Sequence, residues 1–301
     1  MNKLLISALC LMFTAVAAQS FDGHRAYEYL KQQVAFGPRN PGSEGHERCR
    51  QFLVQELSRF AARVQEQPFM HYDEVRGLSL TLTNIIARFN PGVEPRILLC
   101  AHWDTRPMAD RDPEKTNRKK PIPGANDGAS GVAVLLEIAR QLSQNPPAIG
   151  VDIVLFDGED YGREGHLEEY FLGSRHFVKN NKGFFPRYAI LLDMVGDAQL
   201  ELPIEAYSAQ YAPDVVEKVW GLAAELGIPQ FVYESGIHVN DDHVILNQGG
   251  IPTINIIDFA YPDQSHRYWH TLEDTPDKCS PASLQAVGEV LMELIRREKA
   301  W

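Results

Sequence analysis

The sequence contains no apolar run long enough to span a membrane. A transmembrane helix needs about 20 predominantly apolar residues, and the apolar run Leu4–Ala15 is shorter than that. This run follows Met1-Asn2-Lys3 and leads into small residues that end at Ala18, which is the order of a cleavable signal peptide. The sequence therefore predicts a signal peptide over residues 1–18, export to a periplasm or to the cell exterior, and no membrane span.

Cysteine is also scarce, with four residues in a chain of 301. Cys10 would leave with the signal peptide, and the remaining Cys49, Cys100 and Cys279 cannot all pair with one another. At least one of them is therefore free or bonded to another chain. Cys100 ends an apolar run, where we expect a buried and unreactive thiol. Nothing in this pattern indicates cysteine catalysis.

Positive charge is in deficit. The chain has 29 Lys and Arg against 40 Asp and Glu, a formal net charge of −11, and no basic stripe. This balance argues against nucleic acid or an anionic membrane surface as a partner. The sequence also lacks low-complexity tracts, repeats and an evident linker, so we expect residues 19–301 to form a single domain.

What the chain does contain is apolar residues at helical spacing and short β-branched runs. The first two predicted strands flank the turn signal Asn90-Pro91-Gly92, which indicates a hairpin-like start. Beyond them, strands and helices alternate. The spacing predicts helices over 24–36, 43–60, 128–142, 174–180, 213–226, 242–248 and 281–297, and strands over 81–89, 96–101, 151–156, 188–194 and 253–257.

This alternation of buried strands with amphipathic helices is typical of an α/β fold. We expect a three-layer α/β/α sandwich with a mixed, mostly parallel central sheet. In open sheets of this kind, ligands bind beyond the carboxyl ends of the strands. Polar residues that end or follow the predicted strands are therefore the candidates for a functional site.

Carboxylate and imidazole side chains occupy those positions. They are His102 after the strand 96–101, Glu159 and Asp160 after the strand 151–156, Asp193 within the strand 188–194, and His270 beyond the strand 253–257, with Asp127 at the entrance of the helix 128–142. Burying so many like charges without a cation would cost several kcal/mol per group, so the set indicates a divalent metal. Nitrogen and carboxylate ligands with an open position suit catalytic zinc.

Structural explanations compete for some of these residues. Asp127 could cap its helix, a role that Asp fills well. Glu159 and Asp160 could be a solvated pair in a loop. Asp193 is harder to explain in this way, because an unpaired carboxylate inside an apolar strand is rarely left without a partner.

Seven segments together resemble the zinc aminopeptidase-like superfamily, peptidase family M28. The resemblance runs in order from about residue 24 to residue 297, and within the family it is greatest to the glutaminyl cyclase branch, particularly its bacterial form. The segments are His102-Trp103-Asp104, Gly124-Ala125-Asn126-Asp127-Gly128-Ala129-Ser130-Gly131, Asp157-Gly158-Glu159-Asp160, Gly173-Ser174-Arg175-His176, Leu192-Asp193-Met194-Val195-Gly196, Asp241-Asp242-His243 and Trp269-His270-Thr271.

The resemblance implies one zinc ion held by Asp127, Asp160 and His270. It implies cyclisation of N-terminal glutamine to pyroglutamate, with release of ammonia, and therefore peptide or protein N-termini as substrate. The remaining matched positions have roles in catalysis or substrate binding. These are Glu159 as proton shuttle, Asp193 and Asp241 as carboxylates of a hydrogen-bond network beside it, and Trp269 as an aromatic wall, to which Phe259 and Tyr268 are added as further aromatic candidates.

Other functions stay open at this stage. In the aminopeptidases of the same family, the positions of His102 and Asp193 bind a second zinc ion and Asp127 bridges both, so a two-zinc aminopeptidase is the alternative. A non-catalytic binding domain with the same fold is a third hypothesis, although every matched position is filled. The sequence gives no oligomeric state.

Two features favour the cyclase. Asp241-Asp242 stands where the aminopeptidases typically carry Ser-Asp, and Trp269 precedes His270. One feature departs from the animal cyclases, which carry another pocket tryptophan shortly after the acidic pair. The segment Tyr161–Gly165 offers none.

Overall fold

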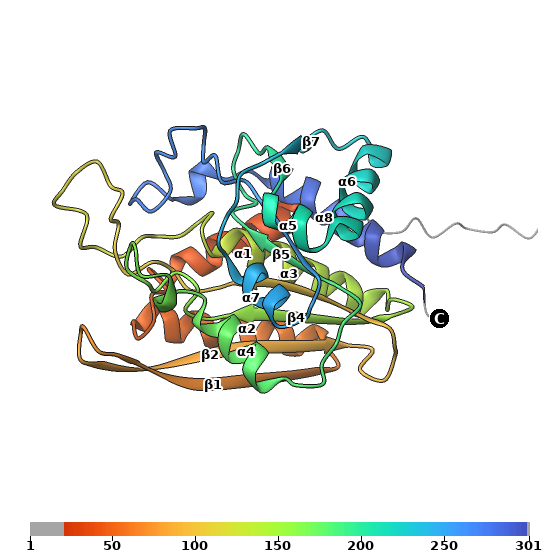
Figure 1. Cartoon of the computed structure of the whole chain (residues 1–301), viewed down its shortest axis with the longest axis horizontal. Coiled ribbons are helices and arrows are strands. Elements are labelled where there is room, and N and C mark those ends of the chain that lie inside the picture. Colours follow the sequence, from red (N-terminus) through yellow and green to blue (C-terminus); the bar gives the residue numbers. More distant parts are fainter. Residues whose placement is uncertain (1–20, 300–301) are drawn as a thin grey trace, which may run out of the picture.

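The computed structural model describes residues 21–299 (Figure 1). The predicted signal peptide, residues 1–18, lies outside the described residues. Within residues 21–299, no helix has both the length and the apolar character needed to cross a bilayer.

A six-stranded sheet forms the centre of the fold, with the strand order β1-β2-β4-β3-β5-β8. The strands β4, β3, β5 and β8 are parallel, whereas β2 pairs antiparallel with both β1 and β4. Two further short strands, β6 and β7, pair with each other in a separate sheet. The strands of the large sheet are β1 (Arg63–Asp73), β2 (Leu78–Phe89), β3 (Arg96–His102), β4 (Gly150–Phe156), β5 (Ala189–Asp193) and β8 (Thr253–Ile257), and those of the small one are β6 (Leu202–Ile204) and β7 (Phe231–Ser235).

Helices cover both faces of the large sheet. The α-helices are α1 (Gly23–Ala35), α2 (Glu44–Phe60), α3 (Ala129–Gln144), α4 (Leu172–Asn180), α5 (Ala206–Tyr211), α6 (Pro213–Leu226), α7 (Asp242–Gln248) and α8 (Pro281–Arg297), and two 3-10 turns span Leu167–Glu169 and Pro276–Lys278. Helices α1, α2, α3, α6 and α8 share one hydrophobic core, while α4 and α7 contribute to a second core.

The strand β3 shows why this sheet is buried on both sides. All seven of its residues are buried. Successive side chains of a strand point to opposite faces, and here Leu99 and Ala101 belong to the core of α1 and α3, whereas Leu98 and Cys100 belong to the core of α4 and α7. The structure therefore confirms the mixed, mostly parallel sheet between two helical layers.

The predicted hairpin-like start is wrong. The strands β2 and β3 are consecutive in the chain but do not pair, because β4 lies between them and bonds to both. The hairpin partner of β2 is instead β1, and these two long strands run along one edge of the molecule (Figure 1).

All three cysteines of the described chain, Cys49, Cys100 and Cys279, are free and buried.

Candidate active site

The residues singled out in the sequence meet at the carboxyl ends of the parallel strands. His102 is the last residue of β3, and Asp193 is the last residue of β5. Glu159 and Asp160 lie in the loop that follows β4, and His270 lies in the segment that follows β8. This is the edge at which an open α/β sheet places its ligands.

Asp127 does not cap helix α3. The N-cap residue is Gly128, and no side chain caps this helix end. Gly128 has φ +104°, and a Cβ atom there would lie 2.3 Å from the carbonyl oxygen of Asp104, so this close approach requires glycine. The turn leaves the carboxylate of Asp127 free to face His102 and His270.

Asp127, Asp160 and His270 bring their ligand atoms to one point, with all of these atoms within 4.8 Å of one another. His270 Nε2 lies 3.5 Å from Asp127 Oδ2 and 3.3 Å from Asp160 Oδ2. Asp160 Oδ2 is buried and makes no hydrogen bond. A buried carboxylate oxygen without a hydrogen bond, facing an imidazole nitrogen, is a suitable ligand for a zinc ion, so these residues fit the metal that the sequence predicts.

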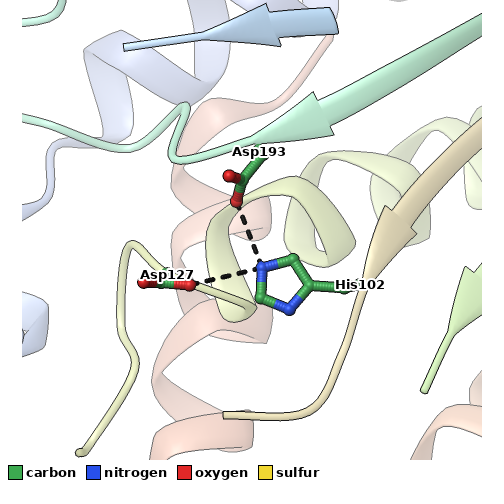
Figure 2. A group of neighbouring side chains, drawn as sticks. All are labelled: His102, Asp127 and Asp193. Atoms are coloured by element: carbon green, nitrogen blue, oxygen red, sulfur yellow. Dashed lines mark hydrogen bonds and ion pairs between the residues drawn. The ribbon is translucent and has the colours of Figure 1, made fainter. Parts of the chain in front are cut away.

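His102, Asp127 and Asp193 form a second such group (Figure 2). His102 Nε2 lies 3.1 Å from Asp193 Oδ1 and 3.3 Å from Asp127 Oδ1. Asp127 therefore belongs to both groups, and its two oxygens face different histidines. The residues of both groups can coordinate a cation.

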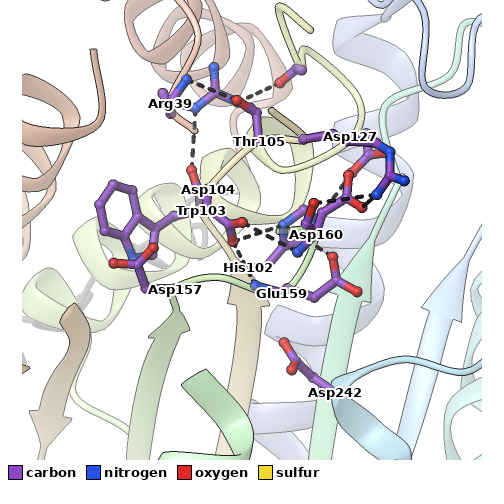
Figure 3. Close-up of polar contacts among 12 residues, drawn as sticks. Arg39, His102, Trp103, Asp104, Thr105, Asp127, Asp157, Glu159, Asp160 and Asp242 are labelled. Atoms are coloured by element: carbon purple, nitrogen blue, oxygen red, sulfur yellow. Dashed lines mark hydrogen bonds and ion pairs between the residues drawn. The ribbon is translucent and has the colours of Figure 1, made fainter. Parts of the chain in front are cut away.

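Two further carboxylates hold the loops that carry these ligands, and the sequence analysis assigned neither a role. Asp104 accepts hydrogen bonds from the backbone N–H groups of Glu159 and Asp160 (Figure 3). Asp274 does the same for the N–H groups of Asn126 and Asp127. Asp104 lies within the family segment His102-Trp103-Asp104, whereas no local sequence pattern marks Asp274 as a site residue.

The electrostatics of the site differ from one carboxyl to its neighbour. Burial raises the pKa of Glu159 well above its ordinary value, and the nearby Asp241 and Asp160 raise it further. For Asp160, burial alone would raise the pKa, but the charges of His270 and Arg106 outweigh it and lower the pKa to about 2. The two adjacent acids therefore differ in protonation: the raised pKa of Glu159 allows it to carry a proton, whereas the lowered pKa of Asp160 keeps it an anion.

Asp241 is anchored at the N-terminus of α7. Its Oδ1 accepts the N–H of Asp242, and its Oδ2 accepts a hydrogen bond from the Asn255 side chain at 2.7 Å. Burial and repulsion by Asp193 raise the pKa of Asp241 to about 7. Asp242 is held separately, by the hydroxyl of Ser174.

A cavity of about 430 Å³ opens above these groups. Trp269 and Phe259 line it with their rings 5.0 Å apart, and the indole of Trp269 stacks on the imidazole of His270 at 3.9 Å. Tyr268 packs instead on Tyr261 and is not among the lining residues of the described chain, so its expected place in the pocket is wrong.

Among residues 21–299, no tryptophan lines the side of the cavity beyond the acidic pair, in line with the sequence of the segment Tyr161–Gly165. Leu167, Tyr170 and Phe171 line it, together with Glu164 and Gly165. Glu164 and Gly165 belong to the segment Tyr161–Gly165, whereas the apolar residues Leu167, Tyr170 and Phe171 follow it.

The profile of the family described as "Peptidase family M28" matches residues 84–295, which include both candidate metal groups. The chain belongs to peptidase family M28. The family assignment made from the seven sequence segments is thereby confirmed.

Solved structures resemble this M28 chain over nearly its whole length. The glutaminyl cyclase of Tannerella forsythia is 42% identical, with a TM-score of 0.89, and the match covers 93% of this chain and 100% of that one. A leucine aminopeptidase precursor from Bacteroides thetaiotaomicron is 41% identical, with a TM-score of 0.89 and coverage of 95% and 100%. Among curated proteins, the glutaminyl-peptide cyclotransferase of Bos taurus is 22% identical over 295 residues, which cover 85% of this chain and 77% of that protein.

The M28 site also contains a buried arginine that the sequence analysis missed. Arg106 lies in the loop after β3, and its side chain is 1% exposed. It contacts the Asp160 carboxylate at 2.7 Å. A lone arginine in a loop gave no signal in the sequence, because such residues are usually solvated.

Proposed function

We propose that this M28 chain is a zinc-dependent glutaminyl-peptide cyclotransferase, which converts the N-terminal glutamine of peptides or proteins to pyroglutamate and releases ammonia. The observation that carries the proposal is the aromatic wall at the metal group. Trp269 stacks directly on the candidate ligand His270, and Phe259 extends this wall along the cavity. The resemblance to glutaminyl cyclases over nearly the full chain supports the same activity.

We further propose that residues 19–301 form one catalytic domain, that the enzyme binds one zinc ion, and that it is exported. Asp127, Asp160 and His270 would hold the ion. Bound there, the cation would supply Lewis acidity, polarising the γ-carbonyl of the substrate glutamine and stabilising the negative charge that develops on its oxygen.

Glu159 would move the proton. The reaction joins the substrate α-amine to its own γ-carboxamide carbon, so the amine loses a proton and the departing nitrogen gains one. Glu159 lines the cavity beside the metal group, and burial raises its pKa, which suits a group that accepts and then returns a proton.

Asp193 and Asp241 would assist Glu159, and the aromatic wall would position the substrate. Both carboxyls line the same cavity, where burial and repulsion by Asp193 raise the pKa of Asp241, and burial and repulsion by Asp127 raise the pKa of Asp193. Trp269 and Phe259 would enclose the glutamine side chain and exclude bulk water. No water molecule is a reactant, because nucleophile and electrophile belong to one residue.

A two-zinc aminopeptidase is the second candidate. The group His102, Asp127 and Asp193 supports it, since these residues can hold a second cation. In that enzyme Glu159 would act as base towards water rather than towards the substrate amine. One of the similar solved structures is named as an aminopeptidase precursor, which is why the reaction product must be measured.

The decisive experiment offers the purified enzyme a peptide with N-terminal Gln and a matched peptide with N-terminal Leu. We expect the first to lose ammonia and become its pyroglutamyl form, and both chains to stay uncut. Mass spectrometry distinguishes these products directly. Free Gln or free Leu in the mixture would identify an aminopeptidase instead.

Asp241→Ser supplies an internal control, because it restores the Ser-Asp-His order of the aminopeptidases. We expect it to depress cyclisation while the protein stays folded. The side chain of Asp241 accepts from Asn255 and from the N–H of Asp242, and a serine hydroxyl retains the ability to cap α7.

A further inference from the structure

Arg106 makes an unusual set of contacts for a buried residue. All three of its side-chain nitrogens contact acids, and only two acids are involved. Nη1 donates to Asp160 Oδ1 at 2.7 Å, while Nε and Nη2 form a two-pronged contact with the two oxygens of Asp110, at 2.9 and 2.6 Å. The Tyr170 ring lies beneath the guanidinium at 5.5 Å. The planar guanidinium therefore holds both acids in fixed directions.

The contact with Asp160 determines which oxygen of that carboxylate is available. Oδ1 is occupied by Arg106, whereas Oδ2 is buried, makes no hydrogen bond, and lies 3.3 Å from His270 Nε2. Arg106 thus aims one chosen oxygen of Asp160 at the point where the metal ligands meet.

The contact with Asp110 reaches a second ligand. Asp110 Oδ1 lies 3.7 Å from His270 Nδ1, on the far side of the ring from Asp127 and Asp160. A carboxylate at Nδ1 favours the tautomer with its proton on that nitrogen, which leaves the lone pair of Nε2 for a metal.

We propose that Arg106 is the positioning residue of the metal centre: it orients Asp160 directly and His270 through Asp110. The inference rests on the proposed zinc site. It concerns how the ligands are held and not the reaction that follows. Loss of such supporting contacts typically weakens metal binding about 10- to 100-fold.

The test measures zinc affinity by competition with a chromophoric chelator, on protein that was first stripped of metal. Arg106→Lys keeps the charge but cannot make the planar, two-pronged contact, so we expect its zinc dissociation constant to rise about 10- to 100-fold. Asp110→Asn leaves the Arg106–Asp160 contact in place, removes the charge beside His270, and replaces one of the two oxygens that accept from Arg106 with an amide NH2 group. We expect a smaller rise in the zinc dissociation constant of Asp110→Asn. This milder variant still tests the proposal if Arg106→Lys fails to fold.

Arg96→Lys is the matched control. Arg96 is also buried, with its side chain 7% exposed, and its Nε and Nη2 contact both oxygens of Asp152 at 2.7 and 2.8 Å. It lies at the opposite end of β3 from His102. We expect Arg96→Lys to lower thermal stability without changing zinc affinity.

Substitution with Co²⁺ gives a second measurement that reports ligand geometry. We expect the visible spectrum of the cobalt protein to change in Arg106→Lys and Asp110→Asn but not in Arg96→Lys. Wild-type zinc affinity and an unchanged spectrum in the two site variants would overturn the proposal, as would an equal loss of affinity in Arg96→Lys. A wild-type protein that binds zinc but cyclises no glutamine would refute the proposed function alone, whereas one that binds no zinc would refute both.

Discussion

Glu159 and Asp160 are adjacent in the chain, yet their surroundings drive their pKa values in opposite directions. The backbone of both residues is fixed by Asp104, so replacing the Glu159 side chain need not disturb Asp160. We expect Glu159→Gln to keep its zinc and to lose turnover by about 10²- to 10⁴-fold, the usual contribution of a general acid or base. Zinc analysis together with the rate of pyroglutamate formation checks both statements. A near-native rate would remove Glu159 from the mechanism, and loss of zinc would make it a ligand.

The two histidines at the site separate the one-metal and two-metal hypotheses. His270 faces Asp127 and Asp160, whereas His102 faces Asp127 and Asp193. With a single zinc in the first group, His270→Ala loses most of the metal and His102→Ala keeps it. Elemental analysis of the wild type should give one zinc per chain. Two zinc ions at full activity, with one lost in His102→Ala, would favour the aminopeptidase.

At the scale of the elements, the buried strands and the long helices could be predicted because their side chains carry clear patterns. The strands β3 and β4 are mostly apolar and are buried over their whole length, and α8 shows an apolar stripe. The strand β1 was not predicted, because it is a largely exposed edge strand of mixed polarity with Pro68 in its middle. The three-residue strand β6 is too short to show any period.

Strand order could not be predicted from the chain either. A turn signal predicts that the chain bends, but not where the next strand inserts into the sheet. For the site, the rule about strand ends was enough to find His102, Asp193 and Glu159, since each ends or follows a strand. Arg106 and Asp274 lie in loops. Only the folded structure brings Arg106 to the carboxylate of Asp160 and Asp274 to the backbone N–H of Asp127.

At the scale of the whole molecule, Glu205 ties the small sheet to the main body. It accepts hydrogen bonds from the backbone N–H groups of Tyr207, Ser208 and Val239 and pairs with His243 of α7 at 3.0 Å. Burial alone would raise its pKa, but the contact with His243 and these hydrogen bonds outweigh it and lower the pKa to about 2.

This shift makes Glu205 a source of acid sensitivity. In the unfolded chain its pKa is about 4.3, so below that value the unfolded state binds a proton that the folded state does not, and stability falls as the pH drops towards 2. We expect Glu205→Gln to cost about 1–3 kcal/mol near pH 7. The difference from the wild type should shrink as the pH falls from 5 towards 2. Urea unfolding of both proteins across that range is the measurement, and a difference that does not change with pH would contradict the assignment.

The ligands that meet at the carboxyl edge of the sheet come from separate segments between residues 102 and 270. No short stretch of the unfolded chain can assemble them, because each is delivered by a different strand or loop. A cation bound there therefore binds the folded form alone, and mass action adds its binding free energy to the stability of the whole chain. We therefore expect a chelator to lower the melting temperature of the enzyme as well as to stop the reaction.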